Sequence, residues 1–166
     1  DVDKDRLEDL QRKIAARQKT DDEESREWTS DHNLLYTLLC ISFFADQEID
    51  ETEKEVIFNS YSKFIDDVTD QSFNIDFGMT TTKFIDLKSE SSRQAYYDYS
   101  LLAIKENKQF NHKDLVKVIN AYVDIANADD FIHEKEVTLI QHAINIWDLK
   151  LNINKPKSGK KLEIER

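Results

Sequence analysis

The apolar run LLYTLLCISFFA, residues 34–45, is the feature that most constrains the fold. Its apolar side chains would lie almost all round a helix, a pattern typical of a helix buried on every side. Two residues that can cap a helix, Ser30 and Asp31, come just before it. We therefore expect a helix over residues 30–46 at the centre of the molecule, with the other elements packed round it.

The rest of the chain predicts more helices and few turns. It has only two glycines and one proline, whereas sandwiches and barrels need many turns and therefore many of these residues. Amphipathic spacing predicts helices over residues 50–66, 90–106, 111–129 and 133–149, and Asn111 caps the third of these. The predicted fold class is all-α.

Residues 90–106 carry an apolar stripe. Ala95, Tyr99 and Leu102 form this stripe, and Leu101 and Ile104 lie beside it. The tyrosines of this segment predict a half-buried helix with its hydroxyl groups reaching water, which is favoured here over an interface.

Three segments lack a strong helical pattern. Residues 1–29 hold a thinly apolar helix over 3–19 and a charged linker, and residues 67–88 predict a long connection with no more than one short helix. Residues 150–166 form a basic tail that we expect to be mobile. The folded domain is therefore expected to span residues 30–149.

Charge restricts the partners. The net charge is −11, which opposes direct binding to nucleic acid, because phosphate contacts need lysine and arginine. A hard divalent cation or a basic protein surface would be attracted instead. The single cysteine, Cys40, lies inside the apolar run and is expected to be a small buried hydrophobe. No apolar stretch reaches the roughly 18 residues that a membrane span needs. We expect a cytoplasmic domain of a larger protein.

An acidic pattern, A-D-x-x-I-x-x-x-E, occurs twice. The segments are FADQEIDETEKEVI (44–57) and NADDFIHEKEVTLI (127–140), and a shift of 83 residues aligns Asp46 with Asp129 and Glu53 with Glu136. An apolar helix is expected before each copy and an amphipathic helix after it. The chain is therefore expected to contain a duplicated helix–acidic turn–helix unit, arranged as a pseudo-symmetric bundle.

Helix capping and a solvated acidic surface are the simplest explanation of these turns. Asp50 followed by Glu53 matches a capping box, in which each side chain accepts from the other residue's amide. In the second copy His133 takes the place of Asp50, and histidine is a poor cap. Capping therefore does not account equally for both copies.

Divalent-cation binding is the alternative. The pattern is similar to the second half of a calcium-binding EF-hand loop, whose last glutamate clamps the ion with two oxygens. The first half differs, because Phe44 and Ile125 stand where side-chain ligands would be, and Gln47 and Asp130 replace the glycine. The chain is thus not an EF-hand, although the acids of one turn, or of both turns together, could surround one hard cation.

The repeated pattern resembles the TerB-like family, the fold of tellurite-resistance proteins and of the N-terminal part of DjlA-type co-chaperones. ADQEIDETE and ADDFIHEKE carry the resemblance, which extends over residues 30–149. The family's glycine after the first aspartate is missing from both copies. The resemblance implies a compact, non-enzymatic bundle of about seven helices.

The resemblance also implies a function. TerB-like domains act in bacterial stress and phage-defence systems, are thought to bind divalent cations such as calcium, and join membrane-associated assemblies. Transferred by position, the metal-binding residues would be the acids of the two turns. They are Asp46, Asp50, Glu53, Asp129, Asp130 and Glu136. The expected partner is another protein or another domain of the same chain.

Two other functions stay open. The acids could serve only as caps in a structural or oligomerisation domain. A hydrolase is the third hypothesis, but Cys40 lies among leucines and phenylalanines, and the four histidines show no zinc-type pair. The expected function is therefore binding, with no catalytic residues.

Overall fold

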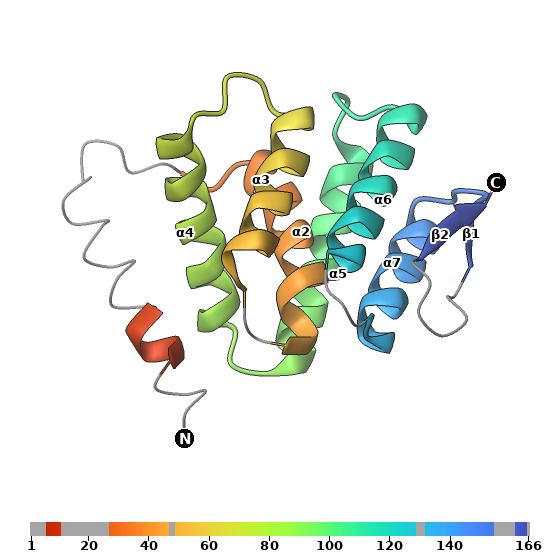
Figure 1. Ribbon diagram of the computed structural model, residues 1–166. Helices are drawn as coiled ribbons and strands as arrows, with labels where there is room; N and C mark the ends of the chain where they lie inside the picture. The colour runs from red at the N-terminus through yellow and green to blue at the C-terminus, as the bar shows by residue number, and fades with distance from the viewer. Residues whose placement is uncertain (1–5, 11–26, 47–48, 129–131, 155–161, 166) are drawn as a thin grey trace.

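The computed structural model describes residues 6–10, 27–46, 49–128, 132–154 and 162–165. These residues form a helical bundle with one two-stranded sheet at its side, which confirms the predicted all-α class (Figure 1). Residues 6–10 are a short helical segment, and Leu7 packs against the core. Six longer helices follow: α2 Ser30–Asp46, α3 Glu51–Phe64, α4 Asp70–Asp86, α5 Glu90–Glu106, α6 His112–Asn127 and α7 Glu134–Ile146.

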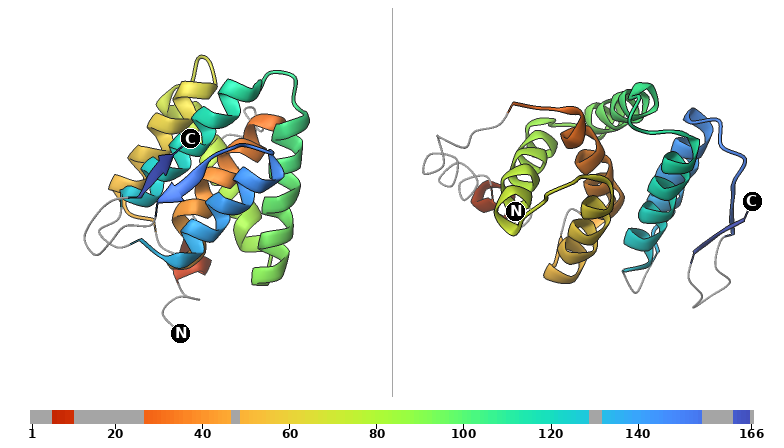
Figure 2. Two further views of the ribbon diagram at one scale, coloured as in Figure 1. Left: turned by 90° about the vertical axis from the view of Figure 1, so that its right-hand side faces the viewer. Right: turned by 90° about the horizontal axis from the view of Figure 1, so that it is seen from above.

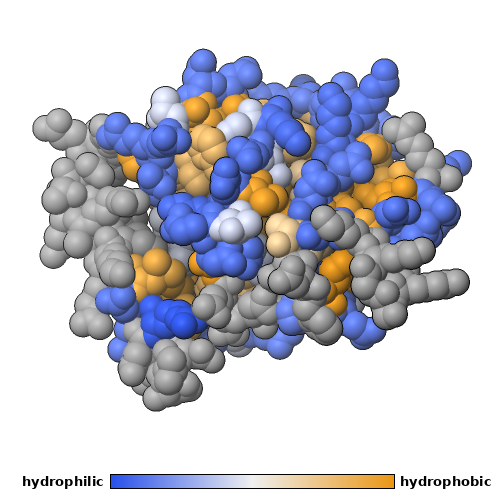
Figure 3. All heavy atoms as spheres, viewed as in Figure 1, coloured by the Kyte–Doolittle hydropathy of each residue, from blue (hydrophilic) through white to orange (hydrophobic). Residues whose placement is uncertain are grey.

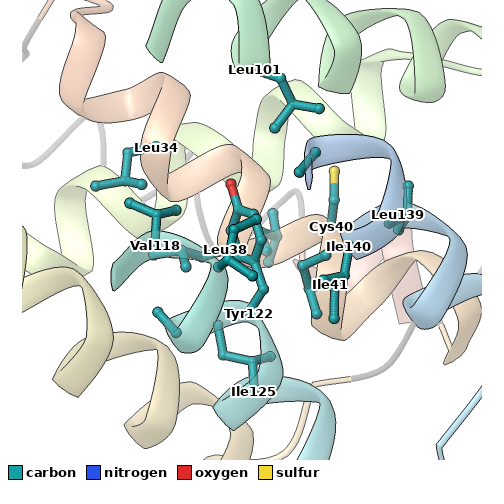
Figure 4. Close-up of a cluster of buried hydrophobic side chains, with 14 of the residues drawn as sticks. Leu34, Leu38, Cys40, Ile41, Leu101, Val118, Tyr122, Ile125, Leu139 and Ile140 are labelled. Carbon is teal, nitrogen blue, oxygen red and sulfur yellow. The ribbon is translucent and has the colours of Figure 1, made fainter. Parts of the chain in front are cut away.

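Helix α2 lies at the centre of the bundle, as its apolar run predicts. It contacts each of the helices α3 to α7, and every side chain from Leu34 to Phe44 is buried. Figure 2 shows the other helices arranged round it, and Figure 4 shows leucine and isoleucine side chains of α2, α6 and α7 meeting in the core. The described part of the chain contains no helix both long and apolar enough to cross a membrane.

The duplication predicted from the sequence corresponds to two helix pairs. Helices α2 and α3 contact each other, helices α6 and α7 do the same, and α2 also contacts α6 and α7. In both pairs the first helix ends and the second begins at the same end of the bundle, the lower end in Figure 1. Lys135, near the start of α7, places its Nζ 4.8 Å from the ring centroid of Phe44, near the end of α2. The end of α2 and the start of α7 are therefore neighbours.

Helix α4 corrects the prediction of a long connection over residues 67–88. Thr69 and Ser72 form a capping box at its start, and the helix then runs for 17 residues. Its buried face includes Asp76, Thr80 and Thr81 beside its phenylalanines. These polar residues hide the apolar period, while both threonine hydroxyls bond to carbonyls of the preceding turn.

Helix α5 has the predicted bounds but turns another face to the core. Tyr97, Leu101 and Ile104 are buried, whereas Tyr99 is 57% and Leu102 48% exposed. Tyr97 is held inside by its hydroxyl group, which donates to the Leu139 carbonyl at 2.8 Å. The stripe through Ala95, Tyr99 and Leu102 is therefore a surface stripe, and Tyr97 is not half-buried as predicted.

The segment after Leu149 corrects the prediction of a mobile tail, as far as it is described. Strands β1 (Asn152–Asn154) and β2 (Glu163–Glu165) pair antiparallel, with Ile153 opposite Ile164. Leu149, Leu151 and Leu162 are buried, and β2 contacts α6. Apolar residues alternating with lysines and asparagines thus anchor a hairpin that the basic composition obscures. The lysines of 155–161 lie outside the described residues.

Candidate functional site

The first acidic turn places one carboxylate on the surface and one inside. Asp50 is the N-cap of α3, and its Oδ1 accepts from the Glu53 amide at 2.8 Å, as predicted. Glu53 does not complete a capping box. Its side chain turns inward, is only 6% exposed, and its Oε2 accepts from the Ser42 hydroxyl of α2 at 2.5 Å. Glu53 therefore joins α3 to α2.

The second acidic turn buries the aligned glutamate without the cap. His133 takes the N-cap place of α7 in an extended conformation, with no side-chain capping hydrogen bond. Glu136 is 2% exposed, whereas Glu134, two residues earlier, is exposed. At the place aligned with Ser42 the second copy has Ile125, a buried apolar residue of α6. What both copies share is a buried glutamate in the first turn of the second helix.

The six predicted metal-binding residues separate into three groups. Glu53 and Glu136 are buried and Asp50 is an exposed cap. The side chain of Asp46 and all of Asp129 and Asp130 lie outside the described residues. Among the side chains that are described, no three histidine, cysteine or acidic groups are placed to hold a metal ion. The described residues therefore do not form a cation site by themselves.

A buried polar network, which was not predicted from the sequence, lies at the opposite end of α2. His32 Nε2 is 3.0 Å from Asp76 Oδ1, and the Tyr61 hydroxyl donates to Asp76 Oδ2 at 3.3 Å. The Thr29 amide donates to His32 Nδ1 at 2.9 Å, so Nε2 carries the proton of the neutral ring and donates to Asp76. Trp28 stacks on His32 at 5.1 Å between ring centroids.

This network is structural in character. His32 and Asp76 are 2% and 4% exposed, and Tyr61 is fully buried, so no substrate reaches them. Polar residues this deep in a core are stable only because they bond to one another. The only signal in the sequence is a histidine in the first turn of an otherwise apolar helix. Nothing local marks Asp76 as its partner.

Cys40 is the remaining candidate for covalent chemistry. Its side chain is fully buried and belongs to the cluster of buried hydrophobic side chains drawn in Figure 4. Burial raises the pKa of the Cys40 thiol well above its usual range, so the thiol stays protonated at neutral pH. A protonated, inaccessible thiol is not a nucleophile.

Two hollows on the surface are described by the structure. One, of about 480 Å³, runs between α3 and α4 and is lined by Phe58 and Phe73 together with acidic residues. The other, of about 330 Å³, lies between α7 and β1 and includes His142. Neither contains Glu53 or Glu136. Comparison of the chain with protein-family models, with curated proteins and with solved structures finds no match.

Proposed function

We propose that this chain is a non-enzymatic, TerB-like binding module whose two acidic turns together bind a divalent cation and, with it, a protein partner. The expected setting is a bacterial stress or defence system, which follows from the sequence resemblance alone. One structural observation supports the proposal: both copies of the repeat bury their aligned glutamate, Glu53 and Glu136, in the first turn of a helix.

Burying a carboxylate carries a cost. An ionised side chain taken out of water destabilises the fold unless hydrogen bonds or an opposite charge compensate it. The positive end of the helix dipole offsets part of this cost in both copies, and Ser42 contributes in the first. A bound cation would place an opposite charge beside both glutamates, in addition to the partners that they already have.

The sequence next to the two glutamates provides the other ligands. Calcium and magnesium bind carboxylate and carbonyl oxygens, and Asp46, Asp129 and Asp130 supply carboxylates within the same two turns. Lys135 of α7 lies over Phe44 of α2, so the helices that flank these turns are neighbours. Carboxylates gathered in this way repel one another, so a cation, or a lysine or arginine of a partner, would relieve the repulsion and order both turns.

Calorimetry on chelator-stripped protein tests the proposal. Calcium, magnesium and manganese are titrated into the unmodified chain and into Glu53→Gln and Glu136→Gln. Glu51→Gln and Glu134→Gln are the matched controls, because these glutamates are exposed in the same first turns. We expect saturable binding of at least one ion, lost in either buried variant and kept in both controls. Equal binding by all four variants would contradict the proposal.

A structural or oligomerisation domain is the second candidate. The observation that favours it is the surface stripe of α5, where Tyr99 and Leu102 are the large hydrophobic residues most exposed in the described part of the chain. Light scattering separates the two candidates. A dimer that forms with or without chelator, and is lost in Leu102→Ser, would favour assembly, while a monomer whose hydrodynamic size responds to the cation would favour the binding module.

A further inference from the structure

We propose that the groove between α3 and α4 is a second binding surface, which takes an arginine- or lysine-rich segment of a partner protein. This surface does not use the buried glutamates of the acidic turns, so it goes beyond the function proposed above. The groove is the hollow of about 480 Å³ described above, and Figure 3 shows apolar atoms in orange between hydrophilic ones in blue over these two helices.

The floor of the groove is aromatic. Phe58 of α3 and Phe73 of α4 meet edge to face with ring centroids 4.9 Å apart, and Phe77 lies 5.5 Å from Phe73. Of the two rings that line the groove, Phe73 is buried and Phe58 is half-buried, so part of the Phe58 side chain is open to the solvent. Aromatic faces of this kind attract arginine and lysine side chains, because the ring face carries negative charge density.

The rim of the groove is acidic. Glu51, Glu55 and Asp70 are exposed along it, against a single cation, Lys54. Glu51 and Glu55 are one turn apart on the same helix, a spacing at which like charges repel. None of these three acids takes part in an ion pair among the residues that the structure describes. A partner's cation would relieve the repulsion as well as gain an attraction.

A cation already lies over a ring next to the groove. Lys54, which lines the groove, places its Nζ 5.2 Å from the ring centroid of Phe77 of α4. In the proposed complex, an arginine or lysine of the partner would lie over the ring of Phe58 in the same way. The neighbouring carboxylates there outnumber the one lysine, so they would attract the added positive charge. The occupant that complements this surface is therefore a basic segment, rather than an acidic or purely apolar one.

Amide NMR of the full chain, labelled with nitrogen-15, tests this inference. The probe is a short peptide with arginines around a central leucine, added at physiological salt, and its counterpart has glutamates in place of the arginines. We expect shift changes concentrated in α3 and α4, with the arginine peptide only. No binding of the arginine peptide, or changes spread evenly over all acidic helices, would overturn the inference.

Two variants with the same net charge distinguish binding at the groove from non-specific attraction by the negative charge of the whole protein. Glu55→Lys reverses an exposed charge at the groove, and Glu106→Lys reverses an exposed charge at the end of α5. We expect Glu55→Lys to weaken binding of the arginine peptide by at least about fivefold, and Glu106→Lys to weaken it much less. Equal weakening by both would show non-specific attraction and overturn the inference.

A third variant tests the floor. Phe58→Leu keeps an apolar side chain and removes the ring, so it should weaken the arginine peptide while the fold remains intact by circular dichroism. If Phe58→Leu does not fold, the two lysine variants, both at exposed positions, decide the question.

Dilution of the unliganded chain is the last control. If the same groove amides shift on dilution, a second copy of the chain occupies the groove, and this result would also overturn the inference.

Discussion

Asp76 is a single carboxylate on which three helices depend. It accepts from His32 of α2 and from Tyr61 of α3 while belonging to α4 itself. Because Asp76 is buried, water cannot replace it as the acceptor for these two donors. His142 and Asp98 are close together on the surface, with Nε2 2.8 Å from Oδ1, no hydrogen bond formed by this Nε2 within the described part of the chain, and both side chains more than a third exposed. Burial, not residue type, decides how much each pair contributes.

The two aspartates should therefore differ when they are removed. We expect Asp76→Ala to lower the free energy of unfolding by about 3 kcal/mol, because it removes the acceptor that two buried donors share. Asp98→Ala should cost less than about 1 kcal/mol, as for other exposed pairs. Urea denaturation of both variants measures the difference. Similar losses in the two variants would mean that the network of His32 and Tyr61 does not need its carboxylate.

At the scale of elements, the predictions succeeded where apolar period and capping agree. The central helix and the cap at Asn111 follow from the sequence. Helix α4 was missed because Asp76, Thr80 and Thr81 occupy buried positions, and their partners are remote in sequence or lie on the backbone. The face of α5 was wrong for a related reason, since its buried stripe includes Ser100 beside Tyr97 and Leu101.

The candidate site was foreseen only as a pattern. Spacing identified Glu53 and Glu136 as equivalent, and the structure gives both the same buried position. The spacing could not show that the Glu53 side chain would accept a hydrogen bond from Ser42 instead of completing the expected capping box, because this hydrogen bond joins two helices. The groove between α3 and α4 depends on a helix that the sequence did not predict, so no pattern pointed to it.

The C-terminal hairpin depends on one side chain of α6. Asn127 donates from Nδ2 to the Leu162 carbonyl at 3.0 Å and accepts at Oδ1 from the Leu162 amide at 2.8 Å. We expect Asn127→Ala to lower the free energy of unfolding by about 1–3 kcal/mol and to speed amide exchange at Leu162. Asn145→Ala, which removes an exposed bond to Gln141, is the control. Unchanged exchange at Leu162 would argue against this clamp.

The tyrosines of the core limit the pH up to which the whole molecule stays folded. Burial raises the pKa of Tyr36, Tyr97 and Tyr122 well above the usual range, and of the half-buried Tyr96 to about 12. In the unfolded chain these groups ionise near their ordinary value of about 10. The unfolded state therefore releases protons first as pH rises, and the folded state loses its advantage.

Alkaline unfolding should show this link. We expect these tyrosines to make their full contribution to the free energy of unfolding at neutral pH. This contribution should fall as the pH rises above about 10. Tyrosinate absorbance of the buried tyrosines should then appear together with the loss of helical circular dichroism. If all the tyrosines ionised while the helical signal stayed intact, the core would be more open than the structure shows.

In the proposed function, two copies of one unit bring their acidic turns together as a single cation site. Paramagnetic broadening of amide signals by manganese, added to chelator-stripped protein, is the first measurement to make. We expect saturable broadening at the starts of both α3 and α7, reversed by calcium or magnesium. Broadening that grows without saturation over all the acidic surfaces, or that is confined to one of the two turns, would show that the turns do not form one site.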